Sequence, residues 1–202
     1  MSGTEEQTSK PIPAKRLMVF VDDANFGNTA IFFRKQPDYL KLREFLVARA
    51  NALLLEMVIY IGYPPQWKEE TLPAEWRYSR DKKIKRRDFL DFNGFMTVAW
   101  YGKEKGETNE KGERLYTANV DVLMAMDVME YAFEVKPDMV ILVTGDQDFA
   151  YLAKKLRRKG IRVEVASIEP TISPELKKAV NGFIDLKAFF NTLPESRSST
   201  ET

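Results

Sequence analysis

The chain has 202 residues, 44% of them hydrophobic, which is enough to bury one core of ordinary domain size. It carries 31 Lys and Arg against 30 Asp and Glu, so its net charge of +1 gives no global attraction to nucleic acid or anionic lipid. It contains neither cysteine nor histidine, which excludes disulfides, thiolate nucleophiles, cysteine-type zinc sites and Ser-His-Asp catalysis, and leaves the chemistry to carboxylates, hydroxyls, Lys, Arg and Tyr.

The two ends of the chain differ from the middle. Residues 1–15 and 194–202 are polar and lack periodicity, so we predict disordered tails around one domain at 16–193. No apolar run reaches the length of about 20 residues that a membrane span needs, and the first residues do not resemble a signal peptide. We therefore expect a cytoplasmic protein with no membrane partner.

Five short apolar runs rich in β-branched residues predict strands. They cover 17–21, 53–61, 95–101, 139–144 and 161–168. Continuous apolar runs suit strands that are buried on both faces, as in a parallel sheet. Segments with helical spacing or helix-forming composition alternate with them, at 38–51, 73–92, 120–134, 147–159 and 174–181. This alternation predicts an α/β domain with a doubly wound, mainly parallel central sheet.

The segment from Gly102 to Gly112 interrupts this alternation. Its sequence, GKEKGETNEKG, consists almost entirely of glycines, charges and polar residues that cannot contribute to a core. We predict that it projects from the surface as a mobile loop.

Aspartates follow two of the predicted strands and begin one of the predicted helices. In an open α/β sheet, ligands bind outside the carboxyl ends of the strands, so these positions are the first candidates for a site. The candidate acids are Asp22, Asp121, Asp146 and Asp148, with Asn25 and Thr144 near them in the sequence.

Each of these aspartates taken alone has an ordinary structural explanation. Asp146 suits a helix cap, Asp121 and Asp148 complement the positive end of a helix dipole, and Asp22 can close an Asx turn. Taken together, several carboxylates at one sheet edge would repel each other and raise their own pKa values unless a cation compensated them. Because oxygen ligands favour Mg²⁺ or Mn²⁺, the set predicts a divalent-metal site.

Three segments in combination resemble the NYN domain of the PIN-like nuclease superfamily. They are VDDANF at 21–26, NVDV at 119–122 and VTGDQDF at 143–149. Their order, spacing and strand context agree from about residue 16 to 190. The resemblance implies a PIN-like three-layer α/β/α fold and a metal-dependent ribonuclease. It makes Asp22, Asp121, Asp146 and Asp148 the catalytic, metal-binding acids, with Asn25 and Thr144 orienting ligands or substrate.

The chain departs from the family pattern in two places, and one further acid needs a separate interpretation. Family members often have Lys-Gly before Val-Asp, whereas this chain has Ala118 and Asn119, which removes a cation that would meet phosphate. Asp23 also stands where glycine is common. Asp127 lies six residues beyond Asp121, so on a helix the two side chains diverge by about 120°. We expect Asp127 to have a supporting or structural role.

A basic cluster predicts contact with RNA. It contains Lys82, Lys83, Lys85, Arg86 and Arg87, and the rings of Trp67, Trp76 and Tyr78 lie upstream of it. Cations would bind phosphates and exposed rings would stack on unpaired bases, which favours single-stranded RNA. The alternative is a solvated helix face with the aromatic rings in the core. A second basic run at 154–159 is better explained by the end of a helix.

The preferred hypothesis is an endoribonuclease that uses metal-activated water to hydrolyse phosphodiester bonds of RNA. The alternative is a non-catalytic regulatory module that keeps the fold and binds RNA or protein. A phosphohydrolase of the haloacid-dehalogenase type ranks lower, because that chemistry needs a second acid where this chain has Ala24. The sequence leaves open a homodimer or a protein partner.

Overall fold

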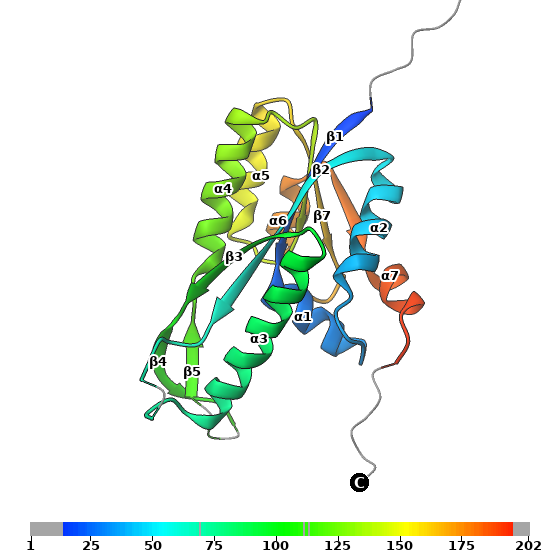
Figure 1. Ribbon diagram of the computed structural model, residues 1–202. Helices are drawn as coiled ribbons and strands as arrows, with labels where there is room; N and C mark the ends of the chain where they lie inside the picture. Colours follow the sequence, from blue (N-terminus) through cyan, green and yellow to red (C-terminus); the bar gives the residue numbers. More distant parts are fainter. Residues whose placement is uncertain (1–13, 69, 111, 113, 196–202) are drawn as a thin grey trace, which may run out of the picture.

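A computed structural model describes residues 14–68, 70–110, 112 and 114–195. Its centre is a six-stranded sheet in the order β3-β2-β1-β6-β7-β8, in which all neighbouring strands are parallel (Figure 1). The strands are β1 (Lys15–Asp22), β2 (Ala52–Tyr63), β3 (Met96–Tyr101), β6 (Met139–Val143), β7 (Arg162–Ser167) and β8 (Gly182–Asp185). The five predicted apolar runs match the first five of these strands, which confirms the predicted sheet.

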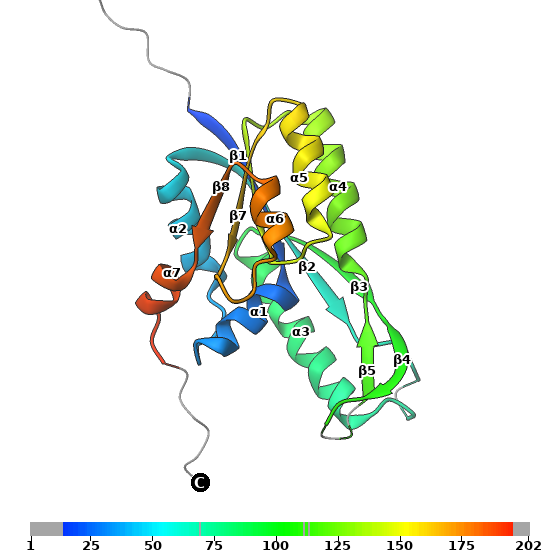
Figure 2. The same cartoon turned by 180° about the vertical axis from the view of Figure 1, so that it is seen from behind.

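Helices cover both faces of the sheet and complete the predicted α/β/α layers (Figures 1 and 2). One layer contains α1 (Asp23–Phe32), α2 (Tyr39–Ala50), α3 (Ala74–Phe92) and α7 (Lys187–Thr192). The other contains α4 (Val120–Glu134), α5 (Phe149–Arg158) and α6 (Pro174–Ala179). The described part of the chain contains no helix with the length and apolar character to cross a membrane.

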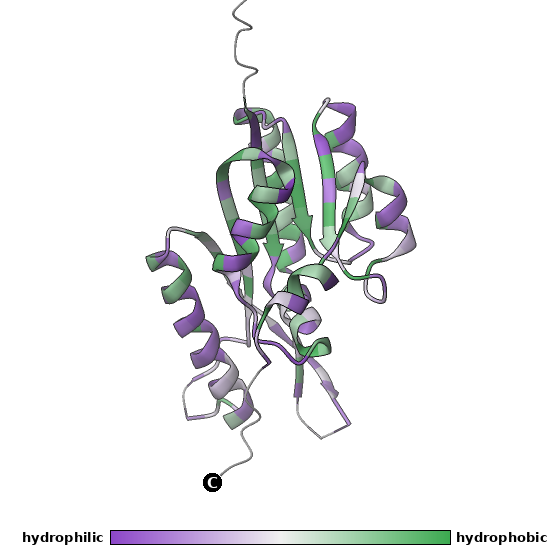
Figure 3. Ribbon diagram, turned by 90° about the vertical axis from the view of Figure 1, so that its right-hand side faces the viewer, coloured by the Kyte–Doolittle hydropathy of each residue, from purple (hydrophilic) through white to green (hydrophobic). Residues whose placement is uncertain are grey.

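Strand β1 shows why the central runs are apolar throughout. Successive side chains point to opposite faces, so Leu17, Val19 and Val21 enter the core under α1 and α2, while Met18 and Phe20 enter the core under α4 and α5. All five side chains are at most 1% exposed. In Figure 3 the strands at the centre are accordingly hydrophobic, whereas much of the helical surface is hydrophilic.

The strand order creates a crevice at the carboxyl edge of the sheet. From β1 the chain proceeds outward through β2 and β3, and it then returns to the other side of β1 with β6. Open α/β sheets bind ligands at the point where the strand order reverses in this way. Val21 pairs with Val143 in the β1–β6 register, so the residues that follow these two strands are brought together.

The segment 102–112 is not the mobile loop that we predicted. Within it, β4 (Lys103–Thr108) pairs antiparallel with β5 (Arg114–Thr117) as a separate two-stranded sheet. Every side chain of β4 is exposed, so the strand lacks the apolar alternation by which strands are recognised in a sequence. The indole N–H of Trp76 donates to the carbonyl of Arg114 at 2.9 Å and ties the hairpin to the start of α3.

The predicted tails at 1–15 and 194–202 lie mostly outside the described residues. Lys15 already belongs to β1, so the folded region begins slightly earlier than we predicted. Pro194 and Glu195 follow α7 and line a groove described below.

Candidate functional site

Asp22 ends β1 and also caps α1. Its Oδ1 atom accepts hydrogen bonds from the backbone N–H groups of Ala24 at 3.0 Å and Asn25 at 3.1 Å. Burial raises the pKa of its carboxyl from 3.8 to about 6; the two N–H groups oppose this rise, and the charges of Asp23 and Asp146 add to it. Asp22 is therefore a structural cap and also a carboxylate under electrostatic pressure, which a nearby cation would relieve.

Asp146 lies in the turn that follows β6, and the two polar residues predicted beside the site shape that turn. The hydroxyl of Thr144, which is buried, accepts the N–H of Asp146 at 3.2 Å. The side-chain oxygen of Asn25 accepts the N–H of Gly145 at 3.0 Å and joins the ends of β1 and β6. Asn25 and Thr144 thus hold in place the turn that carries Asp146. The predicted task of orienting ligands or substrate stays a prediction.

Three of the four predicted acids line one pocket of about 390 Å³ at the crevice. Asp22 comes from β1, Asp146 from the turn after β6 and Asp121 from the first turn of α4. Asp148 is exposed and is not among the residues that line this pocket, although its N–H donates to Asp146 at 3.0 Å. The structure therefore brings together three acids from distant parts of the sequence and leaves the fourth outside.

Asp127 lies away from the acidic pocket. Its carboxylate accepts a hydrogen bond from the hydroxyl of Tyr60 at 2.9 Å, and burial is the main cause that raises the pKa of this tyrosine. This contact joins α4 to β2. The supporting or structural role that we expect for Asp127 stays a prediction.

The acids match the chemistry of a hydrated divalent ion better than that of a closed metal cage. Among the described residues, no group of three acids lies close enough to share an ion. Mg²⁺ is commonly bound through one or two carboxylates, while waters and substrate phosphates complete its shell. Asp22 and Asp146 interact through their charges and face the same pocket, so these two fit such an ion, with Asp121 on the α4 side of the pocket.

The predicted basic cluster is divided by the rotation of α3 into side chains with different surroundings. Lys83 lines the acidic pocket, where its ammonium donates to the carbonyl of Gly62 at 2.5 Å and to the hydroxyl of Tyr116 at 2.9 Å. Arg87 pairs with its neighbour Asp88 at 2.9 Å. Lys82 and Lys85 line a separate groove.

Arg86 forms a buried ion pair that the sequence did not predict. Its guanidinium lies 2.6 Å from the carboxylate of Asp23, which is 2% exposed, and the hydroxyl of Tyr39 donates to the same carboxylate oxygen. Burial raises the pKa of Tyr39, and the negative charge of Asp23 adds to this rise. The departure from glycine at position 23 therefore provides the anchor that fixes α3 beside Asp22.

The departures at positions 118 and 119 have a local explanation. Asn119 adopts a left-handed backbone with φ 46°, a conformation that suits glycine and that asparagine tolerates. Ala118 packs so closely against Gly62 that a Cβ on Gly62 would lie 2.6 Å from the Ala118 Cβ. The cation missing at position 118 is supplied to the pocket from α3 by Lys83. Tyr116 and Gly62, which hold Lys83, gave no signal in the sequence.

The aromatic residues upstream of the cluster do not share one role. Trp76 is 2% exposed and packs edge-on against Trp67 and Tyr116, so of our two interpretations the one that puts the rings in the core holds for Trp76. Tyr78 is 72% exposed and remains available. The second basic run ends α5 as expected, where Arg157 donates to the carbonyl of Ala179 at 2.8 Å.

Comparisons with known proteins agree with this architecture. The family profile described as the NYN domain matches residues 16–187. The Low amplitude and bright protein LabA of Synechococcus elongatus is 25% identical over 175 residues, which cover 85% of this chain and 83% of that protein. The crystal structure of a Vibrio parahaemolyticus protein of unknown function has a TM-score of 0.61 and 20% identity, covering 88% of this chain and 96% of that chain. At this identity, the structural likeness supports the fold alone.

Proposed function

Since the chain belongs to the NYN domain family, we propose that it is a metal-dependent endoribonuclease centred on the acidic pocket. The observation that carries this proposal is the convergence of Asp22, Asp121 and Asp146, from three separate elements, on the pocket that Lys83 also lines. Acids that could bind a cation and a cation that could bind phosphate are thus placed together at the point where the strand order reverses.

Each residue of the pocket has a proposed task. Asp22 and Asp146 would hold Mg²⁺ or Mn²⁺, and Asp121 would bind waters or complete the coordination from α4. When bound, the ion would act as a Lewis acid, activating water and stabilising negative charge on the scissile phosphate. The ammonium of Lys83 would donate to a phosphate oxygen, where a charged donor is most effective as negative charge develops.

The remaining predicted residues would act around this centre. Asn25 and Thr144 would keep the turn that carries Asp146 in position through the hydrogen bonds described above. Asp148 would take part only if its exposed side chain changed conformation to reach the pocket. Lys82, Lys85, Arg86 and Arg87 stay proposed RNA contacts, although the ion pairs of Arg86 and Arg87 make these two weaker assignments.

A second function is favoured by one specific observation. Because no three acids of the described residues lie close enough to share an ion, the same fold would also serve a regulatory module that binds RNA or a protein without cleaving it. The haloacid-dehalogenase alternative loses its basis, since the chain belongs to another family and has Ala24 at the position of the required second acid.

The substitution Asp146→Asn tests the nuclease directly. Asn retains a side-chain oxygen for the N–H of Asp148 but removes one negative charge from the pocket. We expect it to weaken Mn²⁺ binding and to lower cleavage of labelled single-stranded RNA by about 100-fold or more, because metal assistance contributes several kcal/mol. EDTA should abolish cleavage by the unmodified protein.

Asp185→Asn is the matched control. Asp185 ends β8, and its side chain accepts the N–H of Lys187 two residues on, at 2.9 Å, as Asp146 does with Asp148. It should leave cleavage unchanged. Cleavage by Asp146→Asn at the unmodified rate would remove Asp146 from the site. Binding of RNA by all forms, with cleavage by none, would establish the regulatory module instead.

A further inference from the structure

One face of α3 carries aromatic and basic side chains at helical spacing. Tyr78, Lys82, Lys85, Phe89 and Phe92 follow one another at intervals of four, three, four and three residues, which places them in a single row. Tyr78 is 72% exposed, Phe89 52% and Phe92 91%. We call these five residues the α3 strip. Clusters of solvent-exposed aromatic side chains are uncommon on protein surfaces and often mark a binding site.

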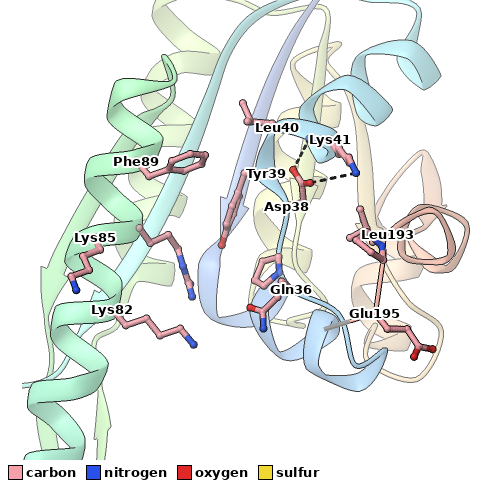
Figure 4. A pocket seen from close by; sticks show the side chains of 13 residues that line it. Gln36, Asp38, Tyr39, Leu40, Lys41, Lys82, Lys85, Phe89, Leu193 and Glu195 are labelled. Atoms are coloured by element: carbon pink, nitrogen blue, oxygen red, sulfur yellow. Dashed lines mark hydrogen bonds and ion pairs between the residues drawn. The ribbon is translucent and has the colours of Figure 1, made fainter. Parts of the chain in front are cut away.

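The middle of the α3 strip lies along a groove of about 610 Å³ between α3 and the start of α2. Figure 4 shows Lys82 and Phe89 extending from α3 toward the wall that carries Gln36, Asp38 and Tyr39. Asp38 caps α2 and faces Lys41 at 3.9 Å. Within the described residues, no carboxylate forms an ion pair with Lys82 or Lys85, so both ammonium groups are available to an anionic ligand.

The groove and the acidic pocket lie on two sides of the same helix. Arg86 lines the groove and pairs with Asp23, which adjoins Asp22. Lys83, one residue after Lys82, enters the acidic pocket. The two hollows are therefore adjacent to each other across α3, through Lys82 and Lys83 and through the Arg86–Asp23 pair.

We propose that the α3 strip and its groove bind the nucleotides that flank the scissile phosphate in single-stranded RNA, an inference that rests on the proposed function for the identity of the polymer. Rings and cations follow one another along the strip, as bases and phosphates do along a nucleic-acid strand. Unpaired bases stack on Tyr78, Phe89 and Phe92, and Lys82 and Lys85 bind phosphates. A duplex hides the faces of its bases and gains little from the rings.

The test compares two matched pairs of substitutions. Lys85→Ala with Phe89→Ala changes the α3 strip, whereas Phe133→Ala with Lys159→Ala changes an aromatic–lysine pair outside both hollows. Phe133 is 57% exposed and Lys159 lies 3.4 Å from the centre of its ring. Binding to a labelled twelve-nucleotide oligoadenylate is measured by fluorescence anisotropy in EDTA, where metal-dependent cleavage is suppressed. We expect the α3 pair to bind about tenfold more weakly and the control pair to bind normally.

Single substitutions separate the two kinds of contact. Lys85→Ala should reduce the slope of log affinity against log salt by about 0.7, because one fewer counterion is released from a single strand. Phe89→Ala should weaken binding and leave the salt slope unchanged. Phe89→Trp, which keeps an aromatic ring, should bind as the unmodified protein does. Phe92→Ala changes a side chain that is 91% exposed, so it tests the strip even where Phe89→Ala lowers the melting temperature.

The outcomes distinguish this inference from the nuclease proposal. Loss of oligoadenylate binding in the α3 variants supports the strip even where the unmodified protein cleaves nothing in Mn²⁺. The strip is overturned if two variants, the double variant Lys85→Ala/Phe89→Ala and the single variant Phe92→Ala, both bind the oligonucleotide as the unmodified protein does. Failure of the unmodified protein to bind the oligonucleotide also overturns it. If the α3 variants no longer bind phosphatidylserine vesicles but still bind RNA, the proposal is overturned and the strip is assigned to a membrane surface.

Discussion

Two sides of α3 carry lysines that are neighbours in the sequence and have opposite surroundings. Lys83 faces the acidic pocket and is held by Gly62 and Tyr116, whereas Lys82 faces an open groove and carries no ion pair with the described residues. Arg86 shows the same contrast with Arg87, since one guanidinium is paired with a buried acid and the other with an exposed one. The direction in which each cation points, and not the charge density of the segment, decides which groups it contacts.

The largest effect should come from breaking the inner ion pair. Arg86→Met would leave the carboxylate of Asp23 buried without its cation, which destabilises a protein by about 3–5 kcal/mol. We expect a lower midpoint in chemical denaturation, with α3 released from its contact beside Asp22.

Arg87→Met is the neighbouring control. The Arg87 and Asp88 side chains are 38% and 60% exposed, and pairs of this kind contribute about 0–1 kcal/mol. Equal losses of stability in the two variants would contradict the division of α3 into an inner and an outer side.

A smaller effect should appear in the pH dependence of stability. The pKa of Asp22 is raised from 3.8 to about 6 in the folded protein, so its protonated form is favoured by folding. The stabilisation from this proton is complete below about pH 4 and is lost as the pH rises through 6. In EDTA at pH 8, Asp22→Asn should therefore be more stable than the unmodified protein by roughly 3 kcal/mol, and the difference should vanish near pH 4.

Asp138 provides a control of opposite sign at the other edge of the sheet. The backbone N–H of Arg16, and then its side chain, lower the pKa of this exposed carboxyl. The stability that it contributes is present above its ordinary pKa and is lost as the pH falls through the lowered value. Asp138→Asn should thus lower stability at neutral pH, and a gain at both positions would contradict the electrostatic account of the pocket.

The smallest effect concerns Lys83 and separates the pocket from the α3 strip. Lys83→Met should lower cleavage of a minimal dinucleotide and of a twelve-nucleotide RNA alike, by about tenfold or roughly 1.4 kcal/mol. Lys85→Ala should affect the longer substrate alone, because a dinucleotide in the pocket does not extend to the groove. An effect of Lys83→Met that is confined to the longer RNA would move Lys83 from the pocket to the strip.

The sheet was predictable because its physical signal is local. Apolar runs at 17–21 and 139–144 require burial on both faces, and the parallel arrangement follows from the helices between the strands. Helix α1 was missed because it starts directly after Asp22 and contains Gly27, and β4 was missed because all its side chains are exposed.

The site was predictable in part. The contacts that were not predicted depend on residues far apart in the sequence or on the rotation of α3 about its axis. Asp22 and Asp146 share one pocket because strand ends meet at a sheet edge, and Asp121 joins them from the first turn of α4, whereas exposed Asp148 does not line the pocket. The contact between Asp23 and Arg86 joins residues 63 positions apart and has no local signal. The phase of α3 was readable in principle, since Lys83 lies midway between the buried Trp76 and Leu90 at intervals of seven residues.

The hydrogen bond between Asn25 and Gly145 joins residues 120 positions apart, so it can form only after residue 145 has been synthesised. Strands β1, β2 and β3 leave the ribosome first, and β1 is then an edge strand with open backbone groups until residues 139–143 emerge and pair with it. Of the paired strands in the sheet, β1 and β6 are the farthest apart in the sequence, and Asp22 ends β1. The acidic pocket is therefore assembled late in translation, and a nascent chain shorter than about 145 residues lacks the turn that carries Asp146.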